Sequence, residues 1–294
     1  MNTMNTNTLE SLSDRTFSCT VENIKKLSDL ISCLHVSGNK VDASLICSIE
    51  ITTDQFALTT TNRSKTYQAC VNLDQSFFEN YFCKSEKINV SVNLNLLLES
   101  FHVLNSTNDS VKCTIIYKEA ESLLILSFEE SGIYVTINIT TIHTDGNEGF
   151  QPDDIQKMTE DDDKCTIILK SDILKDAFHE LIDYYNAKSV TIEINIESGL
   201  LILSTITTIG VCVLKFTKTS PDSIVAFTCS SSLTFSYSIE SFLSANRSLA
   251  IATETQLCMR SNGFLQLLNR VEDDKDGQDA YIDFLVFPQD VIHG

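Results

Sequence analysis

The carboxylates of the chain are the first side chains whose type and spacing could support chemistry. Two acidic runs stand out, Glu160-Asp-Asp-Asp163 and Glu272-Asp-Asp274, the second with Asp276 close behind. Carboxylates that converge on one point can hold the metal ions of a two-metal nuclease. Both runs, however, fall in predicted loops, and the second fills a hairpin turn that closes on Asp276-Gly277. We therefore interpret both as solvated charge runs.

The histidines and the known short motifs give no stronger catalytic signal. The five histidines are dispersed along the chain, and none has a metal-ligand spacing to another histidine or to a cysteine pair. The sequence contains no GxGxxG, GxxxxGK[ST] or GxSxG motif. His179 beside Glu180 on a predicted helix is better explained by a solvated helix face than by acid–base catalysis. We predict no catalytic residue, no metal and no cofactor.

Composition and cysteine usage narrow the class of protein. The net charge of −19 excludes a protein that coats nucleic acid with a broad basic face. The ten cysteines show no CxxC spacing and most lie in apolar stretches, which is typical of free, buried thiols in the reducing cytosol or nucleus. No apolar run approaches the roughly 20 residues of a membrane span, and the N-terminal residues do not resemble a secretory signal.

The elements that must position any site follow a doubled pattern. Thr16–Glu22 is a predicted strand, and Asn23 can cap a helix whose apolar residues recur at helical spacing. Lys164–Lys170 is again a predicted strand, and Ser171 is a possible cap for a second helix. A strand that runs into a short helix follows in each half, from Ile88 and from Leu233, at nearly the same offset.

We predict an α+β fold of two similar domains, each with antiparallel sheets and two helices, joined by an interdomain linker. The predicted parts are a flexible N-terminus 1–15, domain 1 at 16–139, a connecting loop at 140–163, domain 2 at 164–288 and a tail at 289–294. Further strands are expected at Val111–Lys118, Leu123–Glu129, Ile133–Ile139, Val190–Glu197, Leu200–Ile206, Ile209–Phe216, Ala250–Arg260, Phe264–Val271 and Ala280–Phe287.

Two of these strands are candidates for free sheet edges. Ile133–Ile139 and Ile209–Phe216 are long, apolar and nearly uncharged. A free edge of this kind pairs readily with another chain unless it is covered. We expect Ile133, Val135 and Ile137 on one edge, and Val211 and Val213 on the other, to contact neighbouring subunits.

Several fragments, in order and spacing, resemble the Rad-one subunit family of the heterotrimeric, PCNA-like checkpoint clamp, the nine-one-one ring. They read TVENIKKLSDLI from Thr20, INVSVNL from Ile88, FEESG from Phe128, ILKSDILKDAFHEL from Ile168, NGFLQL from Asn262 and YIDFLVFP from Tyr281. The resemblance runs from about Thr16 to Asp290. The Leu-Ala-Pro-Lys stretch of the homotrimeric replicative clamp is absent, and Leu285-Val-Phe-Pro288 stands in its place.

The resemblance implies a DNA-clamp fold and a non-catalytic subunit of a ring that encircles double-stranded DNA without sequence preference. It implies two other clamp-like subunits, a clamp loader, and checkpoint and repair proteins as partners, with a nuclear location and no membrane. By position, Lys25, Lys26, Lys175 and Arg247 are expected to face DNA phosphate. Ile142, Phe287 and Pro288 are expected to line a groove for partner proteins.

Two alternatives remain open at this point. One is a 3′–5′ exonuclease, an activity sometimes ascribed to this family. The other is a homotrimeric replicative processivity clamp.

Overall fold

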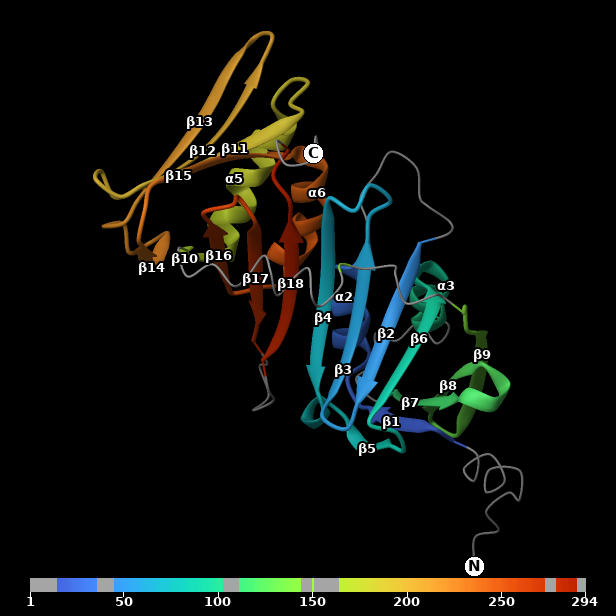
Figure 1. The fold of residues 1–294 in the computed structure, drawn as a ribbon. Coiled ribbons are helices and arrows are strands. Elements are labelled where there is room, and N and C mark those ends of the chain that lie inside the picture. The colour runs from blue at the N-terminus through green and yellow to red at the C-terminus, as the bar shows by residue number, and fades with distance from the viewer. Residues whose placement is uncertain are drawn as a thin grey trace, which may run out of the picture. The chain divides into compact units, whose positions relative to one another are not determined.

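A computed structural model describes residues 15–35, 45–102, 111–143, 150, 164–272 and 279–289. The first acidic run, Glu160–Asp163, lies outside these ranges, and so do Asp273, Asp274 and Asp276 of the second. The elements of the first half are β1 (Phe17–Val21), α2 (Ile24–Ser32), β2 (Ile46–Thr52), β3 (Gln55–Thr61), β4 (Tyr67–Asp74), β5 (Glu79–Cys83), β6 (Lys87–Asn93), α3 (Leu94–Phe101), β7 (Lys112–Lys118), β8 (Leu123–Glu130) and β9 (Ile133–Thr140) (Figure 1).

The second half contains strands and α-helices in the same order as the first half. They are β10 (Lys164–Lys170), α5 (Ser171–Asp183), β11 (Ser189–Asn195), β12 (Leu200–Thr207), β13 (Gly210–Thr217), β14 (Ile224–Cys229), β15 (Leu233–Ser238), α6 (Ile239–Leu249), β16 (Glu254–Arg260), β17 (Leu265–Val271) and β18 (Ala280–Val286). Two compact units result. Unit 1 contains β1, β2, β5 to β9, α2 and α3, unit 2 contains β10 to β18, α5 and α6, and β3 and β4 are divided between the units.

The strand orders show that the fold is built twice. The order β5-β1-β7-β8-β9 recurs as β14-β10-β16-β17-β18, and β4-β3-β2-β6 recurs as β13-β12-β11-β15. The counterpart of each strand is therefore nine strands later in the chain. Neighbouring strands in these sheets are antiparallel, with Cys19 opposite Ile115 and Cys165 opposite Met259, for example. The prediction of a duplicated α+β fold with antiparallel sheets is confirmed.

Helices α2 and α3 each begin where an asparagine side chain accepts a hydrogen bond from a backbone N–H group. The Asn23 side chain accepts a hydrogen bond of 2.8 Å from the backbone N–H of Lys26, as the sequence predicts, and Asn93 caps α3 through Leu96 N–H at 3.0 Å. The prediction for Ser171 is wrong. Helix α5 begins at Ser171 itself, and the Ser171 hydroxyl lies buried against Thr255 instead of capping the helix.

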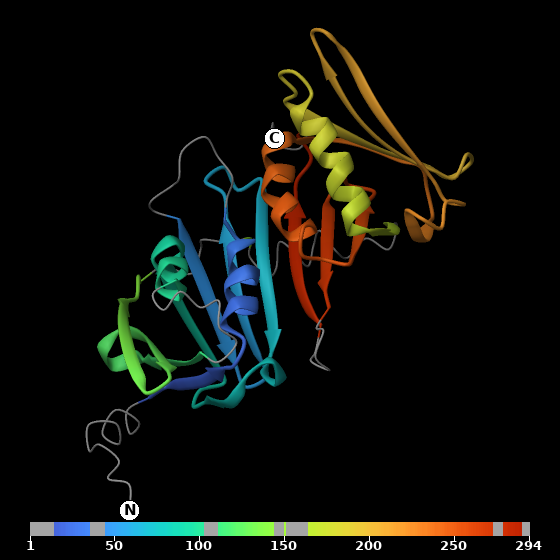
Figure 2. The same ribbon diagram turned by 180° about the vertical axis from the view of Figure 1, so that it is seen from behind.

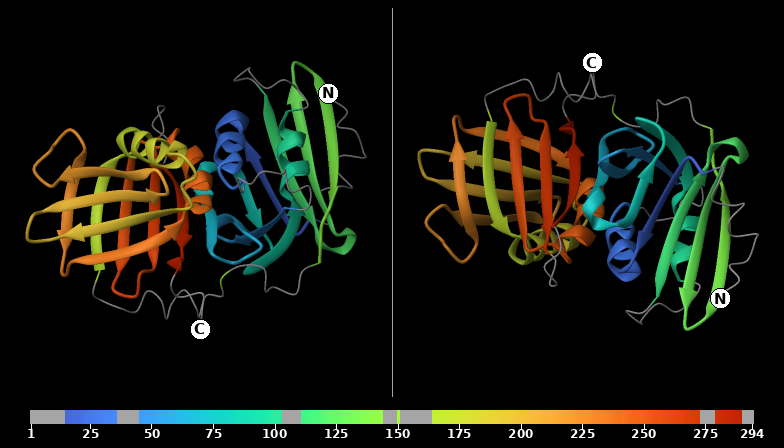
Figure 3. Two further views of the ribbon diagram at one scale, coloured as in Figure 1. Left: turned by 90° about the horizontal axis from the view of Figure 1, so that it is seen from above. Right: turned by 90° about the horizontal axis from the view of Figure 1, so that it is seen from below.

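The two helices of unit 2 lie side by side over its sheets. Figures 2 and 3 show α5 and α6 next to each other from behind, from above and from below, and the two helices are in contact. The Phe178 and Phe242 rings meet edge to face with centroids 4.7 Å apart, and Leu174 and Leu181 on the same stripe are fully buried. The apolar stripe of α5 therefore faces the core, as its spacing predicts.

The observed strand limits differ from the predicted ones mainly at turns. Helix α6 continues to Leu249, so the strand expected from Ala250 begins only at Glu254. Ile209 lies in the turn before β13 and Phe287 lies beyond β18.

The ten cysteines are free thiols, buried or half-buried. Within the described part of the chain, no helix is long and apolar enough to cross a membrane.

Candidate nucleic-acid interface and subunit edges

Helix α2 carries two of the four cations that were expected to face DNA, and they differ in environment. Lys25 is exposed. Lys26 is half-buried, and its Nζ lies 5.7 Å from the centroid of the Phe77 ring. A cation over an aromatic face is held by the ring quadrupole. Lys25 is thus the freer of the two to meet a phosphate group, while Lys26 also packs on its own unit.

A carboxylate pair lies close to the start of the same helix. Lys112 on β7 has its Nζ 2.8 Å from Glu22 Oε1 and 3.4 Å from Glu79 Oε2. The hydrogen bond to Lys112 lowers the pKa of Glu22, and the contact with Glu22 raises the pKa of Lys112. Because two carboxylates share one ammonium group, this end of α2 carries excess negative charge near Lys25.

Helix α5 presents more acid than base to solvent. Lys175 is half-buried on this helix, whereas Asp172, Asp176, Glu180 and Asp183 are all exposed. A surface that binds phosphate must present cations. The exposed face of α5 is therefore a poor phosphate-binding surface, despite Lys175.

Arg247 occupies the last turn of α6 and is exposed. A cation there is also favoured by the negative end of the helix dipole. Among the four residues expected to face DNA, Lys25 and Arg247 have the exposure that phosphate contact requires. Their contact with DNA stays a prediction.

Strands β9 and β13 lie at the ends of their sheets, so the prediction that both are edges is confirmed. Side chains alternate along each. On β9, Ile133 is exposed while Val135 and Ile137 are half-buried, and on β13, Val211 and Val213 are exposed. Within the described ranges no further strand pairs with either, so each edge offers unpaired backbone groups flanked by apolar side chains, which is what strand addition from another chain needs. Contact of these residues with neighbouring subunits stays a prediction.

The residues expected to form a partner groove fall in different surroundings. In unit 1, the Ile142 backbone N–H donates to Ser91 O of β6 over 2.7 Å, which holds the start of the predicted linker on that strand.

In unit 2, the Phe287 ring meets the Phe150 ring at 4.7 Å and the Phe264 ring at 5.5 Å, and Pro288 is buried. Phe287 and Pro288 therefore contribute to packing within this unit. The shared groove stays a prediction.

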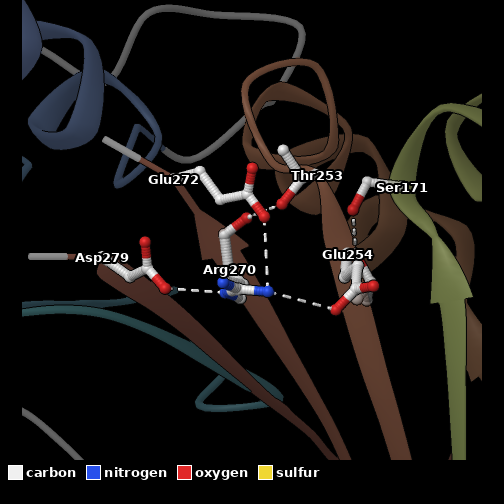
Figure 4. Close-up of polar contacts among 7 residues, drawn as sticks. Ser171, Thr253, Glu254, Arg270, Glu272 and Asp279 are labelled. Carbon is white, nitrogen blue, oxygen red and sulfur yellow. Dashed lines mark hydrogen bonds and ion pairs between the residues drawn. The ribbon is translucent and has the colours of Figure 1, made fainter. Parts of the chain in front are cut away.

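The acidic run that begins at Glu272 meets an arginine (Figure 4). Arg270 has its Nε 2.7 Å from Asp279 Oδ2, and its Nη1 3.3 Å from Glu272 Oε1 and 3.5 Å from Glu254 Oε2. Nearby carboxylates, first Asp279, raise the pKa of Arg270, so the guanidinium stays charged. A permanent cation at the centre of these carboxylates opposes the binding of a divalent metal ion there.

No group of three metal-binding side chains occurs among the residues that the structure covers. His179 is exposed, and its Nδ1 lies 2.8 Å from Asp183 Oδ2, one helical turn away. The pair belongs to the polar face of α5, in line with the sequence interpretation.

The sequence interpretation did not name two exposed residues near an edge, Ile206 and Ile209, as contact residues, although it began the edge strand at Ile209. A signal existed in the sequence, since the hairpin turn Thr208-Ile209 has neither the glycine nor the asparagine that is more usual in a tight turn.

A fold built twice from antiparallel sheets and helix pairs, with open strands at the sheet ends, defines a sliding-clamp protein of the PCNA type. The family model described as Repair protein Rad1/Rec1/Rad17 matches residues 16–269, and the chain belongs to this family. It is therefore a clamp-like protein of the DNA-damage checkpoint and DNA repair. A search of curated proteins gives no match.

Proposed function

We propose that the chain is a non-catalytic subunit of a heterotrimeric checkpoint clamp that works in the nucleus. The ring encircles double-stranded DNA without sequence preference, is placed by a clamp loader, and docks checkpoint and repair proteins. Membership of the Rad1/Rec1/Rad17 family and the clamp fold support this proposal.

The observation that carries the proposal is the character of two of the strands that end sheets, β9 in unit 1 and β13 in unit 2. Strands β9 and β13 end their sheets with apolar, nearly uncharged sequences. Soluble proteins usually blunt such edges with charge, proline or a covering element. A ring subunit needs two edges of this kind, because it has one neighbour on each side.

The charge distribution supports weak contact with DNA through a few cations. Lys25 and Arg247 are exposed on helices of different units, while the net charge of the chain is −19. Charges separated by more than a Debye length of about 10 Å at 0.1 M salt are largely screened, so local cations can still bind phosphate. Such contacts position a protein on DNA without reading its sequence.

A non-catalytic role fits the acidic residues that the structure places. Arg270 pairs with Glu254, Glu272 and Asp279, so these carboxylates already have a cationic partner. DNA degradation that tracks the concentration of the purified chain would instead support the exonuclease alternative.

The test is assembly with the two other clamp-type subunits encoded by the same genome, co-expressed with the full chain and weighed by native mass spectrometry. Val135→Asp on β9 and Val213→Asp on β13 should each abolish the heterotrimer, because each places a charge beside an edge that must be desolvated. Val225→Asp is the matched control, since Val225 is also exposed on a strand that ends its sheet, β14, but is not among the residues expected to contact a neighbouring subunit.

Thermal unfolding of each isolated variant distinguishes an assembly defect from a folding defect. Normal assembly of both edge variants would overturn the proposal. A trimer built from this chain alone would replace the heterotrimer with the homotrimeric clamp.

A further inference from the structure

The end of the β12–β13 hairpin projects beyond the rest of its sheet. Strands β12 and β13 pair from Leu200↔Thr217 to Thr207↔Gly210. Strand β11 pairs with β12 only as far as Thr191↔Ser204. The last part of the hairpin is therefore a two-stranded ribbon without a third strand, and Figures 1 and 2 show it extending past α5 and β11.

This ribbon exposes aliphatic side chains. The exposed fractions are 71% for Ile206, 64% for Ile209, 56% for Val211 and 47% for Val213. Ile206 and Val211 are direct cross-strand partners, so they share one face of the ribbon, and Val213 follows two residues later on that face. The sequence from residue 203 to 214 contains no charged residue.

The opposite face of the ribbon contacts other residues of unit 2. The Thr205 hydroxyl donates to Ser189 O over 2.8 Å. A Cβ at Gly210 would lie 2.8 Å from the Tyr184 hydroxyl oxygen, so the end of the tyrosine side chain lies close against the hairpin backbone here. The hairpin end is thus held in place with its aliphatic face outward.

An aliphatic ribbon held open to water is unfavourable. A two-stranded ribbon alone is marginally stable, and contiguous exposed apolar side chains usually mark a contact with another molecule. The face carries no charge, so an apolar surface matches it better than a charged one.

We propose that the hairpin end is a second contact of the subunit interface, covered by an uncharged, aliphatic surface of the clamp subunit that pairs along β13. The inference rests on the proposed function. Val211 and Val213 belong both to the β13 edge and to the aliphatic face, so the two surfaces are continuous.

Strand addition alone does not cover the whole face. An added strand lies about 4.8 Å from β13, and its side chains reach mainly their direct and diagonal neighbours. Ile206 lies one strand further in, and Ile209 lies in the turn. The neighbouring subunit must therefore supply residues outside its pairing strand, from a segment that folds over the hairpin end.

The experiment compares three variants of the full chain, co-expressed with the two other clamp-type subunits of the same genome. Ile206→Asp combined with Ile209→Asp tests the hairpin end, Val213→Asp tests edge pairing, and Val225→Asp is the control. We expect the hairpin-end variant to weaken assembly at least tenfold, and the control to assemble normally.

The outcomes separate this inference from the proposed function. If Val213→Asp prevents assembly while the hairpin-end variant assembles normally, the inference is wrong and the proposed function stands. If neither variant changes assembly, both are wrong. If the wild-type chain forms dimers by itself and the hairpin-end variant is monomeric, the occupant is a second copy and the inference is again wrong.

Hydrogen exchange gives a test without mutation. Backbone amides in residues 205–212 of the wild-type chain should exchange at least tenfold more slowly in the assembled complex than in the isolated chain. Unchanged exchange in that segment, with slowed exchange along the rest of β13, would overturn the inference.

Discussion

The Thr255 hydroxyl donates a hydrogen bond of 2.8 Å to the amide oxygen of Asn269 in the core of unit 2. Since its one proton is used there, the 2.7 Å contact with Ser171 must be donated by Ser171. The Asn269 amide group then donates to Ser248 Oγ over 3.0 Å, and Ser248 donates to Ala245 O over 2.7 Å. A one-way chain of donors thus links the start of α5, two strands and the last turns of α6.

Replacing Asn269 should destabilise unit 2 strongly. Asn269→Ala leaves the buried hydroxyls of Thr255 and Ser248 each short of a partner, and we expect a loss of about 2–4 kcal/mol in the free energy of unfolding. Urea denaturation of the isolated chain measures it. Asn138→Ala, on the exposed side of β9, is the control and should change stability by less than about 0.5 kcal/mol. Equal losses in the two variants would mean that the buried chain of hydrogen bonds contributes no more to the free energy of unfolding than an exposed side chain does.

Asp283 should make stability fall as pH rises. Burial raises the pKa of this carboxyl from 3.8 to about 6, although Gln266 Nε2 donates to its Oδ2 over 2.9 Å. Its Oδ1 is buried without a partner among the described residues. Below about pH 4 the group is protonated in folded and unfolded chains alike. Between about pH 4 and 6 the unfolded chain ionises first, so stability falls by at most about 3 kcal/mol.

The variant Asp283→Asn removes this ionisation and should be more stable than the wild type at pH 7.5, with a smaller difference at pH 4. Thermal unfolding across that range measures it. Asp74→Asn is a control in which the stability difference from the wild type should change with pH in the opposite direction, because hydrogen bonds from Ser76 lower the pKa of Asp74. A constant difference for Asp283→Asn at every pH would rule out ionisation as its origin.

Charge reversal of the exposed cations should impair retention on DNA. Lys25→Glu with Arg247→Glu leaves the buried helix stripes unchanged, so the assembled clamp should form normally but leave DNA faster. We expect a smaller salt dependence of binding, because each lost phosphate contact removes a counterion-release contribution. Retention on circular DNA at several salt concentrations measures it. Lys164→Glu, an exposed reversal at the start of β10, is the control, and an equal defect there would contradict a local role for Lys25 and Arg247.

Lys26 should behave differently from Lys25 in a stability assay. Lys26→Gln removes the cation from the Phe77 face and should cost about 0.5–1 kcal/mol in unfolding free energy. Lys25→Gln should cost nothing measurable. Urea denaturation of both variants decides the matter, and equal stability would show that the ring contact contributes nothing.

The duplicated fold could be predicted because each helix has a regular apolar stripe and each edge strand a long apolar run. The contact partners of individual polar side chains could not be predicted in the same way. Ser171 follows a strand and precedes a helix, as a cap does, but its hydroxyl bonds Thr255, which is 84 residues away in sequence. Lys26 falls off the apolar stripe, yet Phe77 from a distant turn takes up its ammonium group. Such partners depend on tertiary packing, which spacing within one element does not encode.

The open edges give the acidity of the chain a role before assembly. A lone subunit leaves the apolar edges β9 and β13 and the aliphatic hairpin end uncovered, which favours aggregation between copies. A net charge of −19 makes identical copies repel one another and so maintains colloidal stability. Because salt shortens the range of that repulsion, the unassembled chain becomes less soluble as ionic strength rises. In the proposed ring, where neighbours cover the edges, the same repulsion is no longer needed to keep the protein in solution.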